Sequence, residues 1–475
     1  MSDPAALPPP LARIATHVPG LDEITGGGLL RSGVYILQGS PGAGKTILAN
    51  QMVHRHAAAG GQVVYVTLLA ESHGRLLQHM EVFSFFQPAL LPNQVYYVSA
   101  FNALRTGGLS GVVDLLRTEM RTHRASIVVL DGLVMAESAA GSDEDLKMFI
   151  SDIQAHSTLV GCTTLLLTSE DADRPVSAEH TMVDGIVLLR ERAYGPRRER
   201  NIEIVKFRGS KTLRGNHAFQ IGPEGITIYP RLEAARRSPL GDTALPVGVS
   251  SGIPSLDAMF DISGYAQGSV TTVTGRSGSG KTTLALHFVA RASAQDKAIY
   301  FGFYESPELL VRMGEVLGLP LAPQVASGDL RFIVKSFGEN LLDGLAAELL
   351  AEVARTGAKR VVIDGVGGFT ATPAYAERGG AFVATLANEL RRLGVTTFIV
   401  VEENDRSGTR DVDTSVLSAM GDALLQLTVK EEDEVRRFIS IRKTRLCRSD
   451  LRQRELVLTD TGVAVRDRSA VVAGS

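Results

Sequence analysis

Two glycine-rich segments of this chain have the residue types that bind nucleotide phosphates. Both fit the pattern G-x-x-x-x-G-K-[ST], at Gly39–Thr46 and again at Gly275–Thr282. The glycines let backbone N–H groups turn toward phosphate oxygens, the lysine reaches the terminal phosphates, and the threonine hydroxyl ligates Mg²⁺. The alternative is a glycine-rich turn that holds no nucleotide. Because each segment follows an apolar strand and precedes a helix, the pattern predicts two sites for ATP and Mg²⁺.

The predicted nucleotide-binding positions are the eight residues of each loop and the residue that follows. In the first half these are Gly39, Ser40, Pro41, Gly42, Ala43, Gly44, Lys45, Thr46 and Ile47. In the second half they are Gly275, Arg276, Ser277, Gly278, Ser279, Gly280, Lys281, Thr282 and Thr283.

Aspartates end a buried apolar run in both halves. The runs that close with Asp131 and Asp364 resemble Walker B strands, in which the aspartate holds Mg²⁺ and its water shell beside the phosphates. Together with Thr46 and Thr282 they form the predicted metal sites. An aspartate that only caps the next helix is the alternative.

Hydrolysis needs a carboxylate that orients or deprotonates the attacking nucleophile. Glu71 and Glu305 follow the strand next to each loop strand, within reach of a γ-phosphate. They are therefore the predicted catalytic residues. An N-cap or surface glutamate is the alternative.

A K-x-R pair occurs late in each half, as Lys206 with Arg208 and as Lys443 with Arg445. Phosphoryl transfer gains from a cation on the γ-phosphate, which a neighbouring subunit often supplies. These four residues are the predicted trans-acting contacts. A solvated basic strand is the alternative.

The chain repeats itself with a period of roughly 230 residues. The first residues of the two loops are 236 positions apart, and Asp131 and Asp364 are 233 apart. This recurrence indicates a tandem duplication. The predicted organisation is a disordered arm over 1–12, a first domain over 13–232, a linker over 233–246 and a second domain over 247–475.

Each half alternates apolar strands with helices, which predicts an α/β fold. The strands at 34–37 and 270–273 lead into the loops, and helices follow from Thr46 to about Ala59 and from Thr282 to about Ala294. Strands that are apolar throughout indicate a mainly parallel sheet flanked by helices. Ligands of such sheets lie beyond the carboxyl ends of the strands, where both sets of motifs fall.

Composition limits the function classes. A formal net charge of −3 and a pI of about 6.4 argue against nucleic acid as the main partner. Cys162 and Cys447 have no metal spacing and are expected to stay reduced. The sequence has neither a signal peptide nor an apolar run of membrane length, so we expect a cytoplasmic protein without a membrane partner.

With these motifs the chain resembles the KaiC family, the double-domain ATPases of the bacterial circadian clock, within the RecA-like P-loop superfamily. The resemblance runs from about Arg13 to Val465. It rests on the entry segment Thr16–Leu29 and on the hairpin Lys206–Gly209 with Arg214–Gly215. It implies two tandem RecA-like P-loop domains.

The resemblance also implies a homo-hexamer of two stacked rings with ATP between subunits. The K-x-R pairs would then reach the neighbour's nucleotide. It implies slow hydrolysis of ATP and serine/threonine autophosphorylation in the second ring, and it allows a KaiB-like or other signalling partner.

Several positions depart from the family pattern. Ala70 and Tyr304 stand where the family has the first of two adjacent glutamates, and in the second ring that glutamate serves autophosphorylation. The family's Ser-Thr phosphosite maps onto Ser418 and Ala419, so Ser418 is the predicted phosphosite. The family's glycine after K-x-R is Leu446. Only ten residues follow Val465, so a KaiA-type partner, which engages a longer tail, is not expected.

Three functions remain open from the sequence. The first is a KaiC-like ATPase with autokinase activity that acts in signalling or timing. The second is a RecA-like DNA-dependent ATPase, a recombinase or helicase. The third is a scaffold that ATP assembles and that turns over little nucleotide.

Overall fold

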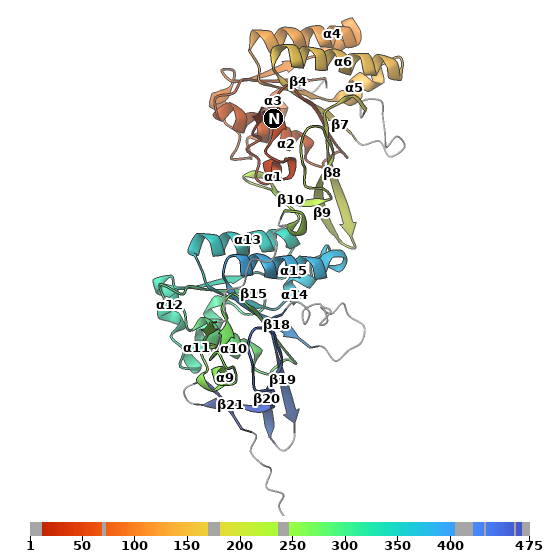
Figure 1. Cartoon of the computed structure of the whole chain (residues 1–475). Helices are drawn as coiled ribbons and strands as arrows, with labels where there is room; N and C mark the ends of the chain where they lie inside the picture. The colour runs from red at the N-terminus through yellow and green to blue at the C-terminus, as the bar shows by residue number, and fades with distance from the viewer. Residues whose placement is uncertain are drawn as a thin grey trace, which may run out of the picture. The chain divides into compact units, whose positions relative to one another are not determined.

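Two nine-stranded sheets, one in each half of the chain, contain the predicted strands (Figure 1). The computed structural model describes residues 12–68, 73–169, 181–235, 247–403, 421–431, 434–459 and 462–467. The chain divides into two units, Met1–Ala235 and Arg236–Ser475. Almost all of the predicted arm and most of the predicted linker lie outside the described residues.

The first unit alternates strands and helices along most of its length. Its strands are β1 (Arg13–Ile14), β2 (Leu29–Leu30), β3 (Val34–Gly39), β4 (Val63–Thr67), β5 (Val95–Ser99), β6 (Ile127–Asp131), β7 (Thr163–Thr168), β8 (Gly185–Tyr194), β9 (Arg197–Phe207), β10 (His217–Gly222) and β11 (Gly225–Tyr229). Its helices are α1 (Leu21–Thr25), α2 (Lys45–Ala58), α3 (His73–Met80), the 3-10 helix η1 (Pro88–Leu90), α4 (Phe101–Thr122), α5 (Leu133–Ala139), α6 (Asp143–Val160) and α8 (Leu232–Ala235).

The large sheet of the first unit has the order β11-β10-β9-β8-β3-β7-β6-β4-β5. The strands from β8 to β5 in this order are parallel. Beyond β8, the strands β9, β10 and β11 continue the sheet in antiparallel pairs. Parallel strands have their carboxyl ends at one edge, so the residues that follow β3, β4, β6 and β7 meet there.

The second unit has the same succession of elements. Its strands are β12 (Gly248–Val249), β13 (Tyr265–Ala266), β14 (Val270–Gly275), β15 (Ala298–Gly302), β16 (Leu330–Val334), β17 (Arg360–Asp364), β18 (Thr396–Glu402), β19 (Ala423–Glu431), β20 (Val435–Thr444), β21 (Arg454–Thr459) and β22 (Gly462–Arg466). Its helices are α9 (Pro254–Asp257), α10 (Lys281–Val289), α11 (Pro307–Val316), α12 (Leu321–Ser327), α13 (Leu342–Thr356), α14 (Gly367–Thr370) and α15 (Tyr375–Arg392).

The second large sheet has the order β16-β15-β17-β18-β14-β19-β20-β21-β22. Read from the opposite edge, this is the order of the first sheet, strand for strand. The strands from β16 to β19 are parallel, and β20, β21 and β22 are antiparallel. The predicted α/β class, with two tandem RecA-like P-loop domains of mainly parallel sheet, is confirmed.

Helices cover both faces of each parallel sheet, which explains why its central strands are apolar throughout. Every residue of β3 and of β14 is buried. In the first unit α2 packs on one face, whereas α4, α5 and α6 pack on the other. Figure 1 shows α4 and α6 side by side on one face of the sheet of the first unit, and α2 on the opposite face. Burial on both faces favours an uninterrupted apolar strand.

The helix after the second loop is shorter than predicted. We expected it to reach about Ala294, but α10 ends at Val289. The side-chain amide of Gln324 donates to the carbonyls of Ala290 and Ala292, at 2.7 and 3.0 Å. The carbonyls at a helix end have no partner within the helix, so the Gln324 side chain, 34 positions from Ala290 in sequence, caps the end of α10. None of the described helices is long and apolar enough to cross a membrane.

Candidate functional site

Both glycine-rich loops connect a central buried strand to a helix. The first loop leads from β3 into α2, and the second leads from β14 into α10. Gly42 and Gly44 have φ of 80° and 104°, and Gly278 and Gly280 have φ of 75° and 100°. Only glycine adopts these angles without strain, which accounts for the spacing of the motif. The N-terminus of each helix adds the positive end of its dipole to the site.

The lysine of each loop folds over its own loop. The Nζ atom of Lys45 donates to the carbonyls of Gly39 and Ser40, at 2.5 and 3.0 Å. Lys281 donates to the corresponding pair in the second loop, at 2.7 Å each. Burial lowers the pKa of both lysines. Asp131 opposes that shift for Lys45, and Glu402, Asp364 and Glu403 oppose it for Lys281. Each ammonium therefore lies within its own glycine-rich loop, at the start of the helix that follows.

The loop threonine meets the Walker B aspartate in both units. Thr46 Oγ1 donates to Asp131 at 3.3 Å, and Thr282 Oγ1 donates to Asp364 at 2.9 Å. Burial raises the pKa of Asp364, while the hydrogen bonds it accepts oppose that rise. The four predicted metal ligands therefore lie in two adjacent pairs, one for each unit.

A tyrosine holds each of these aspartates, and the sequence interpretation missed both. Tyr65 of β4 donates to Asp131 at 2.7 Å, and Tyr300 of β15 donates to Asp364. Both phenols are buried. The sequence did carry a signal, because residues 65 and 300 are 235 positions apart and so keep the period of the repeat. An oriented carboxylate beside a hydroxyl supplies the oxygen ligands that Mg²⁺ prefers.

A cavity of about 630 Å³ opens beside the second loop. Its walls include Lys281, Thr282, Asp364 and the predicted catalytic Glu305. Burial, and to a lesser extent Asp364, raises the pKa of the Glu305 carboxyl. Glu305 thus lies in the same cavity as the lysine and the aspartate. Its counterpart Glu71 lies outside the described residues.

Tyr304 also lines this cavity, directly before Glu305. A Cβ atom on Gly365 would lie 2.2 Å from the Tyr304 ring, so the ring occupies the space above that glycine. The ring also contacts Phe337, with centroids 5.1 Å apart. The position therefore contributes an aromatic wall and no carboxylate.

The K-x-R pairs lie far from the P-loop of their own unit. Lys206 is near the end of β9, and its Nζ atom donates to the carbonyl of Thr181 at 3.1 Å. The Arg208 N–H donates to the carbonyl of Asp184, and the Asp184 carboxylate accepts from the N–H of Val34. Val34 begins β3, whereas the P-loop begins at its last residue, Gly39. Since β3 is six residues long, its two ends are about 17 Å apart.

The second unit repeats this arrangement. The Arg445 N–H donates to the carbonyl of Asp422, whose carboxylate accepts from the N–H of Val270 at the start of β14. Lys443 pairs with Leu424 on β19 near the same end. In both units, therefore, the K-x-R segment lies beside the first half of the loop strand, away from the nucleotide loop that begins at its last residue.

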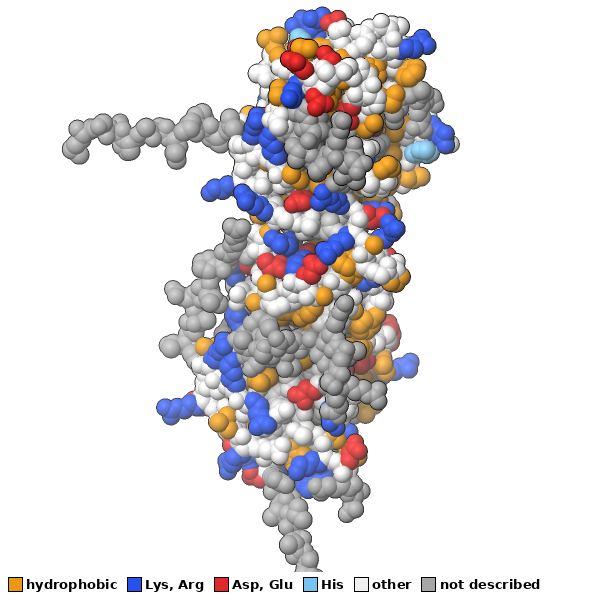
Figure 2. Space-filling model, turned by 90° about the vertical axis from the view of Figure 1, so that its right-hand side faces the viewer, with side chains coloured by type: hydrophobic (Ala, Val, Ile, Leu, Met, Phe, Trp, Pro, Cys, Tyr) orange, Lys and Arg blue, Asp and Glu red, His pale blue; other side chains and the backbone are white. Residues whose placement is uncertain are grey.

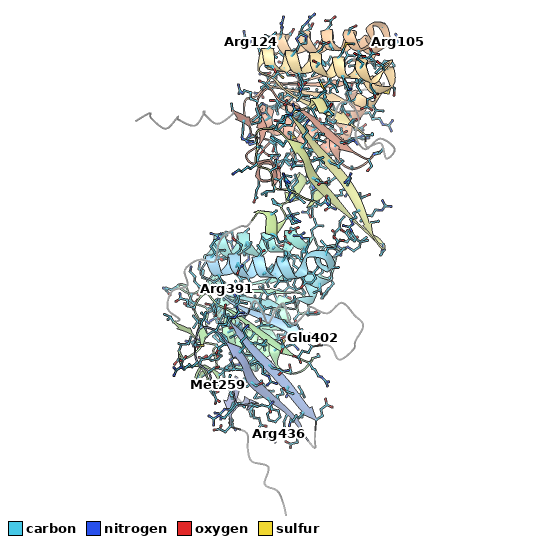
Figure 3. The ribbon with its side chains drawn as sticks, turned by 45° about the vertical axis from the view of Figure 1, so that its right-hand side comes forward. Arg105, Arg124, Met259, Arg391, Glu402 and Arg436 are labelled. Atoms are coloured by element: carbon cyan, nitrogen blue, oxygen red, sulfur yellow. The ribbon has the colours of Figure 1, made fainter. Side chains whose placement is uncertain are left out.

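Further charged groups near the second loop were not predicted. Arg437 of β20 donates to the carbonyl of Gly278 at 2.9 Å and lines the cavity. Glu402, labelled in Figure 3 at the end of β18, lines it too. The predicted phosphosite Ser418 lies outside the described residues.

Comparisons with known proteins agree with this geometry. Residues 14–233 and 249–470 both match the family model described as "ATPase: KaiC". The circadian clock oscillator protein KaiC of a Prochlorococcus marinus strain is 25% identical over 469 residues, which cover 96% of this chain and 92% of the relative. That of Thermosynechococcus vestitus is 26% identical, covering 96% and 89%. The circadian clock protein KaiC2 of Synechocystis sp. is 26% identical, covering 95% and 81%.

Proposed function

This chain belongs to the KaiC family, and from that premise we propose that it binds ATP with Mg²⁺ at two sites and hydrolyses it to ADP and phosphate. The observation that carries the proposal is the grouping of lysine, threonine and aspartate at each P-loop. In the second unit Thr282 lies 2.9 Å from Asp364, and both line the cavity that contains Lys281.

Binding uses the backbone N–H groups of each loop together with Lys45 and Lys281. The hydroxyl and carboxylate pairs described above supply oxygen ligands for Mg²⁺, which neutralises charge on the β- and γ-phosphates when it is bound. Among the described residues, no group of three or more histidine, cysteine, aspartate or glutamate residues could hold a metal ion. One carboxylate and one hydroxyl beside phosphate oxygens suit Mg²⁺ better than an all-protein cage.

Hydrolysis requires a water in line with the γ-phosphate. Glu71 and Glu305 are the proposed residues that orient this water and accept its proton. The water oxygen bonds to the γ-phosphorus, the bond to the β-phosphate oxygen breaks, and ADP leaves.

The neighbouring copy supplies the remaining cations in this proposal. Lys206 lies level with Ile36 and Arg208 lies beside the start of β3, so both are displaced from the loop that begins at the other end of this strand. Lys443 and Arg445 likewise lie beside the first half of β14, toward its start. A ring in which each copy presents this end to the next copy's nucleotide would use them. We therefore propose a homo-hexameric double ring with a signalling or timing role, open to a KaiB-like partner.

The autokinase activity of the second unit is part of the proposal, with Ser418 as acceptor. The γ-phosphoryl group would pass to the Ser418 hydroxyl as the bond to ADP breaks, and the hydroxyl proton would leave to a carboxylate. Tyr304 supplies no carboxylate beside Glu305, so we expect this transfer to be slow.

A DNA-dependent motor is the competing function. On the face shown in Figure 2, basic and acidic side chains are interspersed and form no continuous basic stripe among the residues described there. A net charge of −3 also weakens attraction to phosphate backbones. A salt-dependent rise of the ATPase rate with single-stranded DNA would reverse this ranking.

Substitution of the proposed catalytic glutamates tests hydrolysis. Glu71→Gln combined with Glu305→Gln keeps the shape of each side chain but removes the base, so ADP release should fall about 10²-fold or more. ADP is measured by coupled assay or chromatography, with binding of a fluorescent ATP analogue as the control for site integrity. Equal, near-zero release from parent and variant would favour the nucleotide-assembled scaffold.

Intact mass and peptide mapping after incubation with ATP and Mg²⁺ test the autokinase proposal. We expect one phosphate per chain on Ser418 and none in Ser418→Ala. Phosphate on another residue, with Ser418 unmodified, would contradict the assignment of that segment.

A further inference from the structure

The carboxylate of Glu402 enters the second nucleotide cavity from a strand that the motifs do not mark. Glu402 is the last residue of β18, and β18 lies between β17 and β14. It pairs with Gly275, the first residue of the P-loop. Figure 3 shows the residue at the strand end. Glu402 therefore lies next to the loop that would hold the phosphates.

Three neighbouring strands thus direct an acidic residue to one edge of the sheet. Glu305 follows β15, Asp364 ends β17, and Glu402 ends β18. All three line the cavity together with Lys281. Asp364 is engaged by Tyr300 and Thr282, so it is committed to the proposed metal site. Glu305 and Glu402 flank it.

The Glu402 side chain is exposed, and none of the described residues donates a hydrogen bond to its carboxylate. Its interactions there are electrostatic, with Lys281, Asp364 and Tyr304. An exposed carboxylate needs no protein partner, because water hydrates it. Since Glu402 lines the cavity and pairs with the first residue of the P-loop, its carboxylate can accept a hydrogen bond from a molecule bound there.

The first unit provides an internal comparison. Ile36 pairs with Leu166 in the first sheet as Thr272 pairs with Ile399 in the second. Three residues further along each strand are the P-loop glycine on one side and Ser169 or Glu402 on the other. At this register position the first unit therefore has a neutral side chain, Ser169, and the second has an acidic one, Glu402.

We propose that Glu402 is a second catalytic carboxylate of the second unit, which together with Glu305 holds the water that attacks the γ-phosphate. The inference rests on the proposed ATP hydrolysis. The water donates one hydrogen bond to each carboxylate, its oxygen bonds to the γ-phosphorus, ADP leaves, and one carboxylate accepts the proton. Glu402 supplies the carboxylate that position 304, occupied by tyrosine, does not.

This role predicts an unusual pair of kinetic changes. A carboxylate near the γ-phosphate repels it, so Glu402→Gln should bind ATP more tightly and lower KM. The same substitution removes a carboxylate that orients the attacking water and can accept its proton, so kcat should fall about tenfold or more. If Glu402 only repelled the nucleotide, its substitution would lower KM and leave kcat unchanged or raised. If Glu402 were merely structural, its substitution would not lower KM and kcat together.

The experiment uses the full chain in the Glu71→Gln background, which suppresses turnover in the first unit while leaving its loop intact. Glu402→Gln and Glu402→Ser, the latter matching Ser169, should both show a lower kcat with a lower KM. Glu402→Asp should recover part of kcat. Glu431→Gln, an exposed substitution at the far end of β19, is the matched control and should behave as the background does.

The outcomes separate the two proposals. Glu402→Gln with an unchanged kcat, in a background that hydrolyses ATP, overturns the role of Glu402 and leaves the proposed function standing. A background that releases no ADP overturns hydrolysis in the second unit, and the role of Glu402 falls with it.

Discussion

A chain carrying Lys281→Ala should bind one ATP where the parent chain binds two. Lys281 is 9% exposed and donates two hydrogen bonds of 2.7 Å within its loop, so its ammonium is held at the proposed phosphate site. Removing one partner of a buried charged pair costs about 2–5 kcal/mol, or roughly 30- to 4,000-fold in affinity. The second site should therefore be empty at ATP concentrations that saturate the first.

Isothermal titration with a slowly hydrolysed ATP analogue measures this stoichiometry directly. Lys45→Ala should give the mirror result, with only the second site filled. Lys147→Ala removes a lysine of α6, far from both loops in sequence, and should keep two sites. Loss of both sites from a single substitution would show that the two loops do not act independently.

The sequence was sufficient to predict the fold and the loops, because these depend on short-range patterns. Glycines at fixed spacing between an apolar strand and a helix specify the P-loop within a few residues. Apolar strands that recur with the period of the repeat predict a parallel sheet, and the two sheets have equivalent strand orders. The K-x-R pairs were also found by this period.

Contacts across the sheet could not be read from the same patterns. Glu402 meets the P-loop because β18 pairs with β14, although these strands are more than 120 residues apart in sequence. No motif marks that pairing. The end of α10 is likewise capped by Gln324 of α12, which donates to two carbonyls just beyond the helix. Such features follow from strand order and packing, and only the assembled sheet reveals them.

The two units also differ in the arginine that binds two equivalent aspartates, Asp184 in the first unit and Asp422 in the second. Asp184 has Arg208 at 3.9 Å, whereas Asp422 accepts from Arg391 of α15 at 3.0 and 3.1 Å. Figure 3 labels Arg391 on that helix. In the second unit Asp422, whose carbonyl accepts from the Arg445 N–H, is therefore also bound by α15, a helix that begins shortly after β17. The repeat conserves the position of the aspartate and changes what holds it.

Arg378→Ala should destabilise the second unit more than any surface substitution. The Arg378 guanidinium of α15 donates two hydrogen bonds to the Asp343 carboxylate of α13, at 2.7 and 2.8 Å. The Asp343 side chain is 2% exposed, so the variant leaves a buried charge without this partner. Breaking a buried pair in this way costs about 3–5 kcal/mol. Hydrogen exchange of peptides from α13 and α15 should accelerate, and the apparent unfolding midpoint should fall.

Two matched variants show whether the lost stability comes from the loss of the Arg378–Asp343 ion pair. Arg355→Ala removes an arginine of α13 whose side chain is 60% exposed, and it should leave exchange and midpoint nearly unchanged. Arg378→Met combined with Asp343→Leu removes both charges and should recover most of the lost stability, because apolar side chains replace a buried ion pair at little cost. If the double variant were as unstable as Arg378→Ala, packing between α13 and α15 would be the cause instead of the loss of the Arg378–Asp343 ion pair.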